Sequence, residues 1–251
     1  MPSEDWTIEG LPHETHTLLK RYIQDVRKVY GSELHGIVLF GSAVRGEFMP
    51  GRSNLNILLV LASYDLLVLK QYDGIHQRWS KEQVVVPLFL TAADLQSAAS
   101  VFPLEYQDIQ ESYRVLWGHD PFVGLKIDSC YLGVSVLQAL RGNLLRLRQR
   151  LVEGRSTEEA ITILLSLSIT GLLPALRGLQ RLLNRPVLAH GESLLKDIES
   201  QLALDLTGLR DALSLKRGHI SPGQKEVSRL VDRYIANLTN LITAAEQRIA
   251  M

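Results

Sequence analysis

The hydrophobic pattern of the chain changes character near Pro121. Before this residue, segments with apolar residues at every third or fourth position alternate with short continuous apolar runs, a pattern typical of helices alternating with strands. After it, the pattern is helical throughout. The change predicts an α+β protein, in which residues 1–120 form a domain with a small mixed sheet and residues 121–251 form an all-α helix bundle.

Four short apolar runs in the first domain predict strands: residues 34–40, 55–61, 84–90 and an edge strand at 113–117. Helical periodicity predicts helices over residues 11–30 and 63–80, and Thr91 is a suitable N-cap for a third helix that begins at Ala92. In the second domain we expect helices over these segments: residues 127–152, about 157–183, 192–202, 206–215, and from Ser221-Pro222 to near the C-terminus.

One of these predicted helices contains a long uncharged stretch, as a membrane-spanning helix does. Residues 160–176 carry no charge, but they include two threonines, two serines, a glycine and Pro174, which is a candidate kink. A spanning helix requires about 20 predominantly apolar residues. We therefore expect a helix buried in the bundle, opened by Ser156 or Thr157, and no membrane partner.

The overall charge restricts the class of partner. The chain has 27 basic and 27 acidic residues, so it has no global field that would attract nucleic acid or an anionic membrane. Its single cysteine, Cys130, excludes an internal disulfide and is interpreted as a small apolar helix residue in a reducing compartment. The N-terminal residues lack the basic and apolar regions of a secretory signal, so we expect a cytoplasmic protein.

The segment from Phe40 to Val60 carries the functional signal. The expected strand at 34–40 runs into Gly41-Ser42, where a helical turn is expected to start. Glycine allows a close approach of the backbone to a phosphate, and free N–H groups at a helix start favour an anion. Ser42 can donate a further hydrogen bond. Gly41, Ser42 and Arg45 are therefore the candidate nucleotide-binding residues.

This segment resembles the signature of the DNA polymerase β-type nucleotidyltransferase superfamily, especially its minimal nucleotidyltransferases. That signature is Gly-Ser, three residues, Gly, a short linker, then Ser-Asp-x-Asp and an apolar strand. The matching positions are Gly41, Ser42, Arg45, Gly46, Pro50, Ser53 and the run 57–60, with a linker one residue longer than the commonest form. The resemblance covers roughly the first half of the chain. It implies the fold of that half and a magnesium-dependent transfer from a nucleoside triphosphate.

The departure from the family pattern lies at the metal ligands. Asn54 and Asn56 stand where the family has the two aspartates that hold magnesium. Magnesium is usually held by carboxylates together with phosphates, and an amide brings no charge. The later strand at 84–90, where the family often has a third carboxylate, contains no acid. We therefore expect a catalytically degenerate protein with no metal ligands, which keeps nucleotide or phosphate binding in a binding or regulatory role.

Three alternatives stay open. The chain could be an active nucleotidyltransferase that uses magnesium and a nucleoside triphosphate, with Glu47, Glu82 or Asp94 as substitute ligands. It could also be an interaction or scaffold protein whose helical domain forms a homodimer or binds a protein partner. Finally, the glycines and asparagines of the motif could be ordinary turn and strand-edge residues.

Overall fold

The computed structural model describes residues 6–128, 130–153 and 157–249, which fold into two compact units, Met1–Asp128 and Ser129–Met251. The division falls at residue 128, whereas the sequence pattern placed it between residues 120 and 121. The difference has a packing cause. Phe122 is buried in a core of the first unit, and Leu125 and Ile127 pack against that core. These side chains extend the first unit beyond its last strand.

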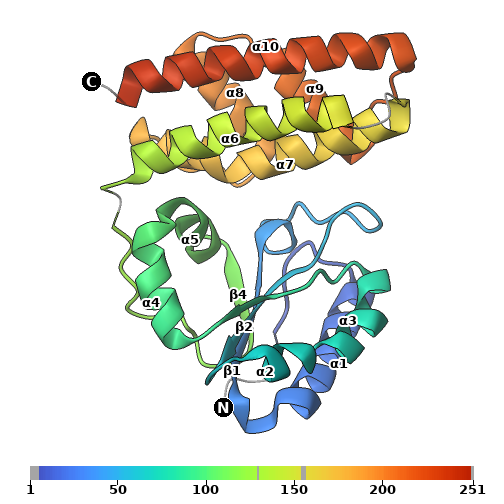
Figure 1. Ribbon diagram of the computed structural model, residues 1–251, viewed down its shortest axis with the longest axis vertical. Helices are drawn as coiled ribbons and strands as arrows, with labels where there is room; N and C mark the ends of the chain where they lie inside the picture. Colours follow the sequence, from blue (N-terminus) through green and yellow to red (C-terminus); the bar gives the residue numbers. More distant parts are fainter. Residues whose placement is uncertain (1–5, 129, 154–156, 250–251) are drawn as a thin grey trace. The chain divides into compact units, whose positions relative to one another are not determined.

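The first unit is built on a four-stranded sheet with the order β3-β2-β1-β4 (Figure 1). Its strands are β1 (Leu34–Phe40), β2 (Asn56–Leu61), β3 (Leu88–Leu90) and β4 (Tyr113–Gly118). β1 is antiparallel to β2 and β4, and β2 is parallel to β3. The structure therefore confirms the small mixed sheet and the edge position of β4.

Helices cover both faces of this sheet (Figure 1). They are α1 (His13–Tyr30), α2 (Leu66–Lys70), α3 (Asp73–Trp79), α4 (Ala92–Val101) and α5 (Pro103–Gln110). Ile37 and Ile57 point to the face that packs on α1 and α3, which we call the α1 face. Val38 and Leu58 point to the opposite face, which packs on α4 and α5 and which we call the α5 face. Successive strand residues thus serve two separate cores.

Two predicted elements of the first unit are shorter than expected. The helix predicted over 63–80 is divided into α2 and α3. Tyr72, between the two, is buried, and its hydroxyl lies 3.0 Å from that of Tyr22 on α1. The strand predicted over 84–90 is reduced to β3, with Val84 forming only an isolated bridge to Leu55. Pro87 interrupts the pairing because it has no N–H to donate.

The second unit is helical throughout its described residues, which confirms the predicted class. Its helices are α6 (Leu132–Glu153), α7 (Glu158–Leu182), α8 (Gly191–Leu202), α9 (Thr207–Arg217) and α10 (Gln224–Ile249). The helix predicted from residue 127 begins only at Leu132, because the chain before it packs on the first unit. Cys130 consequently lies in an exposed turn, and its predicted place inside a helix was wrong.

α7 is the helix that contains the uncharged stretch. Of the described helices, it alone is long and apolar enough to cross a membrane by composition, a property it shares with core helices of soluble bundles. Leu165, Ile169 and Leu172 are buried in the second unit. Thr157 caps the helix by accepting a hydrogen bond from the Ala160 N–H at 3.3 Å, and Ser156 lies outside the described residues. Pro174 is accommodated inside the helix.

Candidate functional site

The Gly41 loop (residues 41–46) follows β1 directly and opens with a 3₁₀ turn, Gly41–Ala43. Gly41 has φ +81°, in the left-handed region, where a side chain is strained. A Cβ atom at this position would also lie 2.9 Å from the Asn56 side-chain nitrogen. Glycine is therefore favoured here by the backbone conformation, and any side chain would also displace the Asn56 amide.

Backbone hydrogen bonds hold the loop in shape. The carbonyl of Gly41 accepts from the N–H groups of Val44 and Arg45 at 3.0 and 3.1 Å, and the carbonyl of Ser42 accepts from Glu47 N–H at 3.0 Å. The N–H groups of Ser42 and Ala43 come at the start of the turn, so they have no carbonyl partner within it. These two N–H groups and the Ser42 hydroxyl are the candidate donors to an anion, although the Ala43 residue is 1% exposed.

The Arg45 side chain is anchored to α5. One terminal nitrogen donates to the Asp108 carboxylate at 2.7 Å and to the Asp108 backbone carbonyl at 2.9 Å. Only 7% of the Arg45 side chain and 12% of the Asp108 side chain are exposed. Its other terminal nitrogen lies 4.0 Å from the position that a Gly41 Cβ would occupy. Arg45, predicted as a phosphate ligand, thus fixes the Gly41 loop on α5.

The two asparagines lie next to this loop. Asn56 pairs with Phe40 across the β1–β2 ladder, and Phe40 packs on the α5 face. Asn56 therefore belongs to the α5 face, half-buried, with its amide against Gly41. Asn54 precedes β2 and is exposed, while Leu55 between them is buried on the α1 face. The alternation places both amides on the side where the family pattern has its carboxylates.

The chain segment beside Asn56 contributes no acid. Leu55 bridges Val84 and Leu58 pairs with Leu88, so the segment alongside Asn56 is Val85-Val86-Pro87. Val86 is 54% exposed, an apolar side chain where the resemblance leads one to expect a carboxylate. In the described parts of the chain, no three His, Cys, Asp or Glu side chains are grouped so that they could hold a metal ion.

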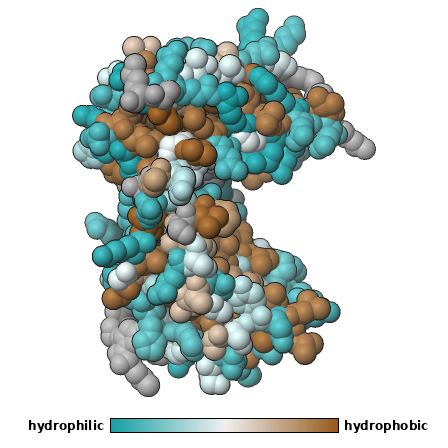
Figure 2. Space-filling view, turned by 60° about the vertical axis from the view of Figure 1, so that its left-hand side comes forward, coloured by the Kyte–Doolittle hydropathy of each residue, from teal (hydrophilic) through white to brown (hydrophobic). Residues whose placement is uncertain are grey.

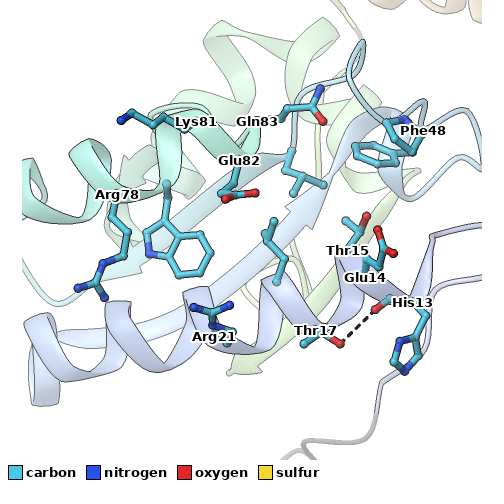
Figure 3. A pocket seen from close by; sticks show the side chains of 14 residues that line it. His13, Glu14, Thr15, Thr17, Arg21, Phe48, Arg78, Lys81, Glu82 and Gln83 are labelled. Atoms are coloured by element: carbon cyan, nitrogen blue, oxygen red, sulfur yellow. Dashed lines mark hydrogen bonds between the residues drawn. The ribbon is translucent and has the colours of Figure 1, made fainter.

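Of the three proposed substitute ligands, Asp94 is engaged in helix capping and Glu82 lines a cavity. Asp94 closes a capping box at α4, where its carboxylate accepts from Thr91 N–H at 2.8 Å and from the Thr91 hydroxyl at 2.7 Å. These bonds, led by the one from the Thr91 backbone, lower the pKa of Asp94. Glu82 lines a cavity beside α1, together with Leu55 of the α1-face core (Figure 3). Glu47 is half-buried directly after the Gly41 loop.

Two residues that sequence reasoning missed support the motif. Asp108 anchors Arg45, and Gln83 accepts a hydrogen bond from Gly51 N–H at 2.9 Å, which ties the linker to the end of η3 (Ser80–Glu82). Ser53 closes the same linker, since its hydroxyl accepts from Met49 N–H at 3.0 Å. Asp108 is 63 positions from Arg45 and Gln83 is 32 from Gly51, so no local pattern could have indicated either pair.

Comparison with solved structures agrees with this fold. The chain superimposes on the crystal structure of the spectinomycin adenyltransferase AAD(9) from Enterococcus faecialis with ATP and spectinomycin, with a TM-score of 0.56 and 12% sequence identity, over 92% of this chain and 99% of that one. This chain has a nucleotidyltransferase-like fold. No protein-family model matches the chain, and no curated protein matches it in sequence. The structural likeness therefore establishes the fold and leaves the activity to be argued from the residues.

The residues present do not suit the magnesium ions that the fold family implies. The side chains at the expected ligand positions are the two amides and the apolar segment 85–87. Magnesium gives up its water reluctantly and depends on charged oxygen ligands, which this arrangement does not supply. The site is thus poorly suited to two-metal chemistry.

Proposed function

We propose that this nucleotidyltransferase-like protein transfers no nucleotidyl group and instead binds a nucleotide, through its phosphates, at the Gly41 loop. Its role is then binding or regulation. The proposal rests on a contrast within one site. Hydrogen bonds hold the Gly41 loop in shape, whereas the residues at the expected metal-ligand positions, Asn54 and Asn56, carry no charge. A two-metal transfer needs the charge that Asn54 and Asn56 lack.

The contacts of the loop support weak phosphate binding. The Ser42 and Ala43 N–H groups belong to the 3₁₀ turn, and we expect them to donate to a phosphate together with the Ser42 hydroxyl. The charge of Arg45 adds little to the local potential because Asp108 neutralises it. We therefore expect binding that depends on hydrogen bonds and on the nucleoside, with a dissociation constant on the order of 0.1 mM, corresponding to roughly 5–6 kcal/mol.

The test of lost catalysis is a transfer assay. Purified protein is incubated with each labelled nucleoside triphosphate and magnesium, with protein, RNA and small-molecule acceptors present, and the Ser42→Ala variant is run in parallel. We expect label incorporation and triphosphate hydrolysis at background level for both proteins. Magnesium-dependent turnover by the wild type that is lost in Ser42→Ala would refute the proposal and favour an active enzyme with substitute ligands.

A second candidate function, interaction with a protein partner, is supported by the surface of the second unit. Figure 2 shows hydrophobic side chains among the hydrophilic ones on the helical unit. Large apolar side chains of α6 and α7 are more than half exposed: Val134, Leu145, Val152, Ile163 and Leu167. Exposed apolar side chains of this size mark interaction surfaces when they are contiguous. Light scattering over a concentration series, with Leu145→Ser/Leu167→Ser as the variant, measures whether this unit self-associates.

A further inference from the structure

A cavity lies in the first unit, on the α1 face of the sheet. It has a volume of about 510 Å³ and is bounded by α1, the linker after the Gly41 loop, and η3 (Figure 3). This volume falls within the range of natural small-molecule sites, roughly 300–1,000 Å³. Nothing in the proposed nucleotide binding uses this cavity.

The floor of the cavity is apolar. Leu18 of α1, Leu55 at the start of β2, Trp79 of α3 and Phe48 of the linker all line it. Leu55 and Trp79 are buried members of the α1-face core, so this floor is part of the rigid interior. The Trp79 indole is fixed further by its N–H, which donates to the Asp25 carboxylate at 3.0 Å. A ligand would therefore meet a preformed apolar surface that includes an aromatic ring.

Opposite charges face this floor from two walls. Arg21 of α1 and Glu82 of η3 both direct their charged groups toward the cavity (Figure 3). Arg21 lies over the Trp79 ring, with its guanidinium carbon 5.9 Å from the ring centroid. Within the described part of the chain neither Arg21 nor Glu82 forms an ion pair, with the other or with any third residue. Each wall thus presents an unmatched charge.

The remaining charges around the cavity do not alter this pattern. Arg78 points away and is paired with Asp25 at 2.7 Å, and Lys81 also points away from the cavity (Figure 3). Glu14 lies at the far end of the cavity, near Phe48. The cavity therefore has a cationic group on the α1 wall, carboxylates on the η3 wall and at the far end, and an apolar floor between them.

We propose that this cavity binds a small zwitterion with an apolar body, of the size and chemistry of a dipeptide. The anionic end of the ligand pairs with Arg21, its ammonium group pairs with Glu82, and its apolar side chains cover Trp79, Leu18 and Leu55. A purely cationic or purely anionic ligand would satisfy one wall and place a like charge near the other. Only a ligand with both charges matches both walls.

The experiment uses the full-length chain labelled with ¹⁵N and the dipeptide leucyl-phenylalanine. The indole N–H of Trp79 is the reporter, assigned by Trp79→Phe, and the indole of Trp117 on β4 is the internal control. The dipeptide is compared with its N-acetylated form, which keeps only the carboxylate, and its C-terminal amide, which keeps only the ammonium. Arg21→Met and Glu82→Gln are the site variants, and Lys20→Met, an exposed α1 residue that does not line the cavity, is the matched control.

We expect saturable shifts of the Trp79 indole with the dipeptide and binding about five-fold weaker for either blocked form, because each loses one solvent-exposed charge pair. Glu82→Gln should abolish the difference between free and N-acetylated peptide, and Arg21→Met the difference between free peptide and amide. Lys20→Met should change neither. The proposal is overturned if the Trp79 indole does not shift up to about 10 mM peptide, or if all three peptides bind equally. Nucleotide binding at the Gly41 loop can succeed or fail independently of this result.

Discussion

At the scale of single residues, the backbone of the Gly41 loop depends on two glycines that are required to different degrees. Gly41 and Gly46 both have positive φ, at +81° and +73°. A Cβ at Gly41 would meet Asn56, whereas a Cβ at Gly46 would have no atom within 4 Å. The pair therefore separates the cost of conformation from the cost of crowding.

We expect Gly46→Ala to destabilise the first unit by about 1 kcal/mol, the cost of the left-handed conformation, and Gly41→Ala by about 1–2 kcal/mol, because the added Cβ also displaces the flexible end of the Asn56 side chain. Urea unfolding followed by tryptophan fluorescence measures this, since Trp6, Trp79 and Trp117 all belong to the first unit. Equal losses for the two variants would show that the contact with Asn56 is unimportant.

The Arg45–Asp108 pair gives a prediction for the anchoring of the loop. Removing one partner of a nearly buried ion pair leaves the other charge uncompensated, which costs about 3–5 kcal/mol for fully buried pairs and less here because both side chains keep some exposure. We expect Arg45→Met to lower the free energy of unfolding by about 2–3 kcal/mol and the double variant Arg45→Met/Asp108→Leu to recover part of this loss. Additive losses in the double variant would contradict a direct coupling.

Placing aspartates at the two asparagine positions tests whether the lost carboxylates explain the lack of a metal site. Asn54→Asp/Asn56→Asp places two carboxylates on the strand positions that the family uses, so we expect this variant to bind Mn²⁺, measured by the loss of the free-ion resonance, at least about ten-fold more tightly than the wild type. Asn54→Gln/Asn56→Gln is the neutral control. Wild-type binding as tight as that of the aspartate variant would mean that other ligands hold the ion.

At the scale of elements, capping and proline positions explain where the predictions succeeded. Thr91 was predicted as an N-cap, and the structure confirms a capping box with Asp94 at the start of α4. The strand at 84–90 was predicted from its valines, but Pro87 removes a donor and leaves only β3 paired. The division between α2 and α3 lies at Tyr72, whose contact with Tyr22 on α1 no local pattern encodes.

The capping box predicts a pH dependence. The folded-state pKa of Asp94 is lowered by its bonds to Thr91, so its contribution to stability is present above the unfolded pKa and is lost as the pH falls through the folded pKa. We expect Asp94→Asn to be less stable than the wild type by about 0.5–1 kcal/mol at neutral pH, with the difference vanishing in acid. Glu105→Gln, an acid in the first turn of α5, is the control. A difference that persists at the acid limit would show that the charge is not the cause.

At the scale of the whole molecule, the sequence predicted the fold class and the motif but not the contacts that support them. Hydrophobic periodicity and the Gly41-Ser42 signature were local and sufficient for an α+β chain with a nucleotidyltransferase-like half. The anchoring of Arg45 by Asp108, the tie of Gln83 to Gly51, and the charges facing the cavity beside α1 join residues far apart in sequence. Such pairs are determined by tertiary packing, so they could be read only from the structure.

The most direct measurement of the central claim is a calorimetric titration of ATP in excess EDTA and again in excess magnesium, with Ser42→Ala as the variant. A loop that holds phosphates through its own donors predicts nearly equal dissociation constants in the two conditions and weaker binding for Ser42→Ala in both. Binding that is about ten-fold or more tighter with magnesium, or undetectable without it, would contradict the account.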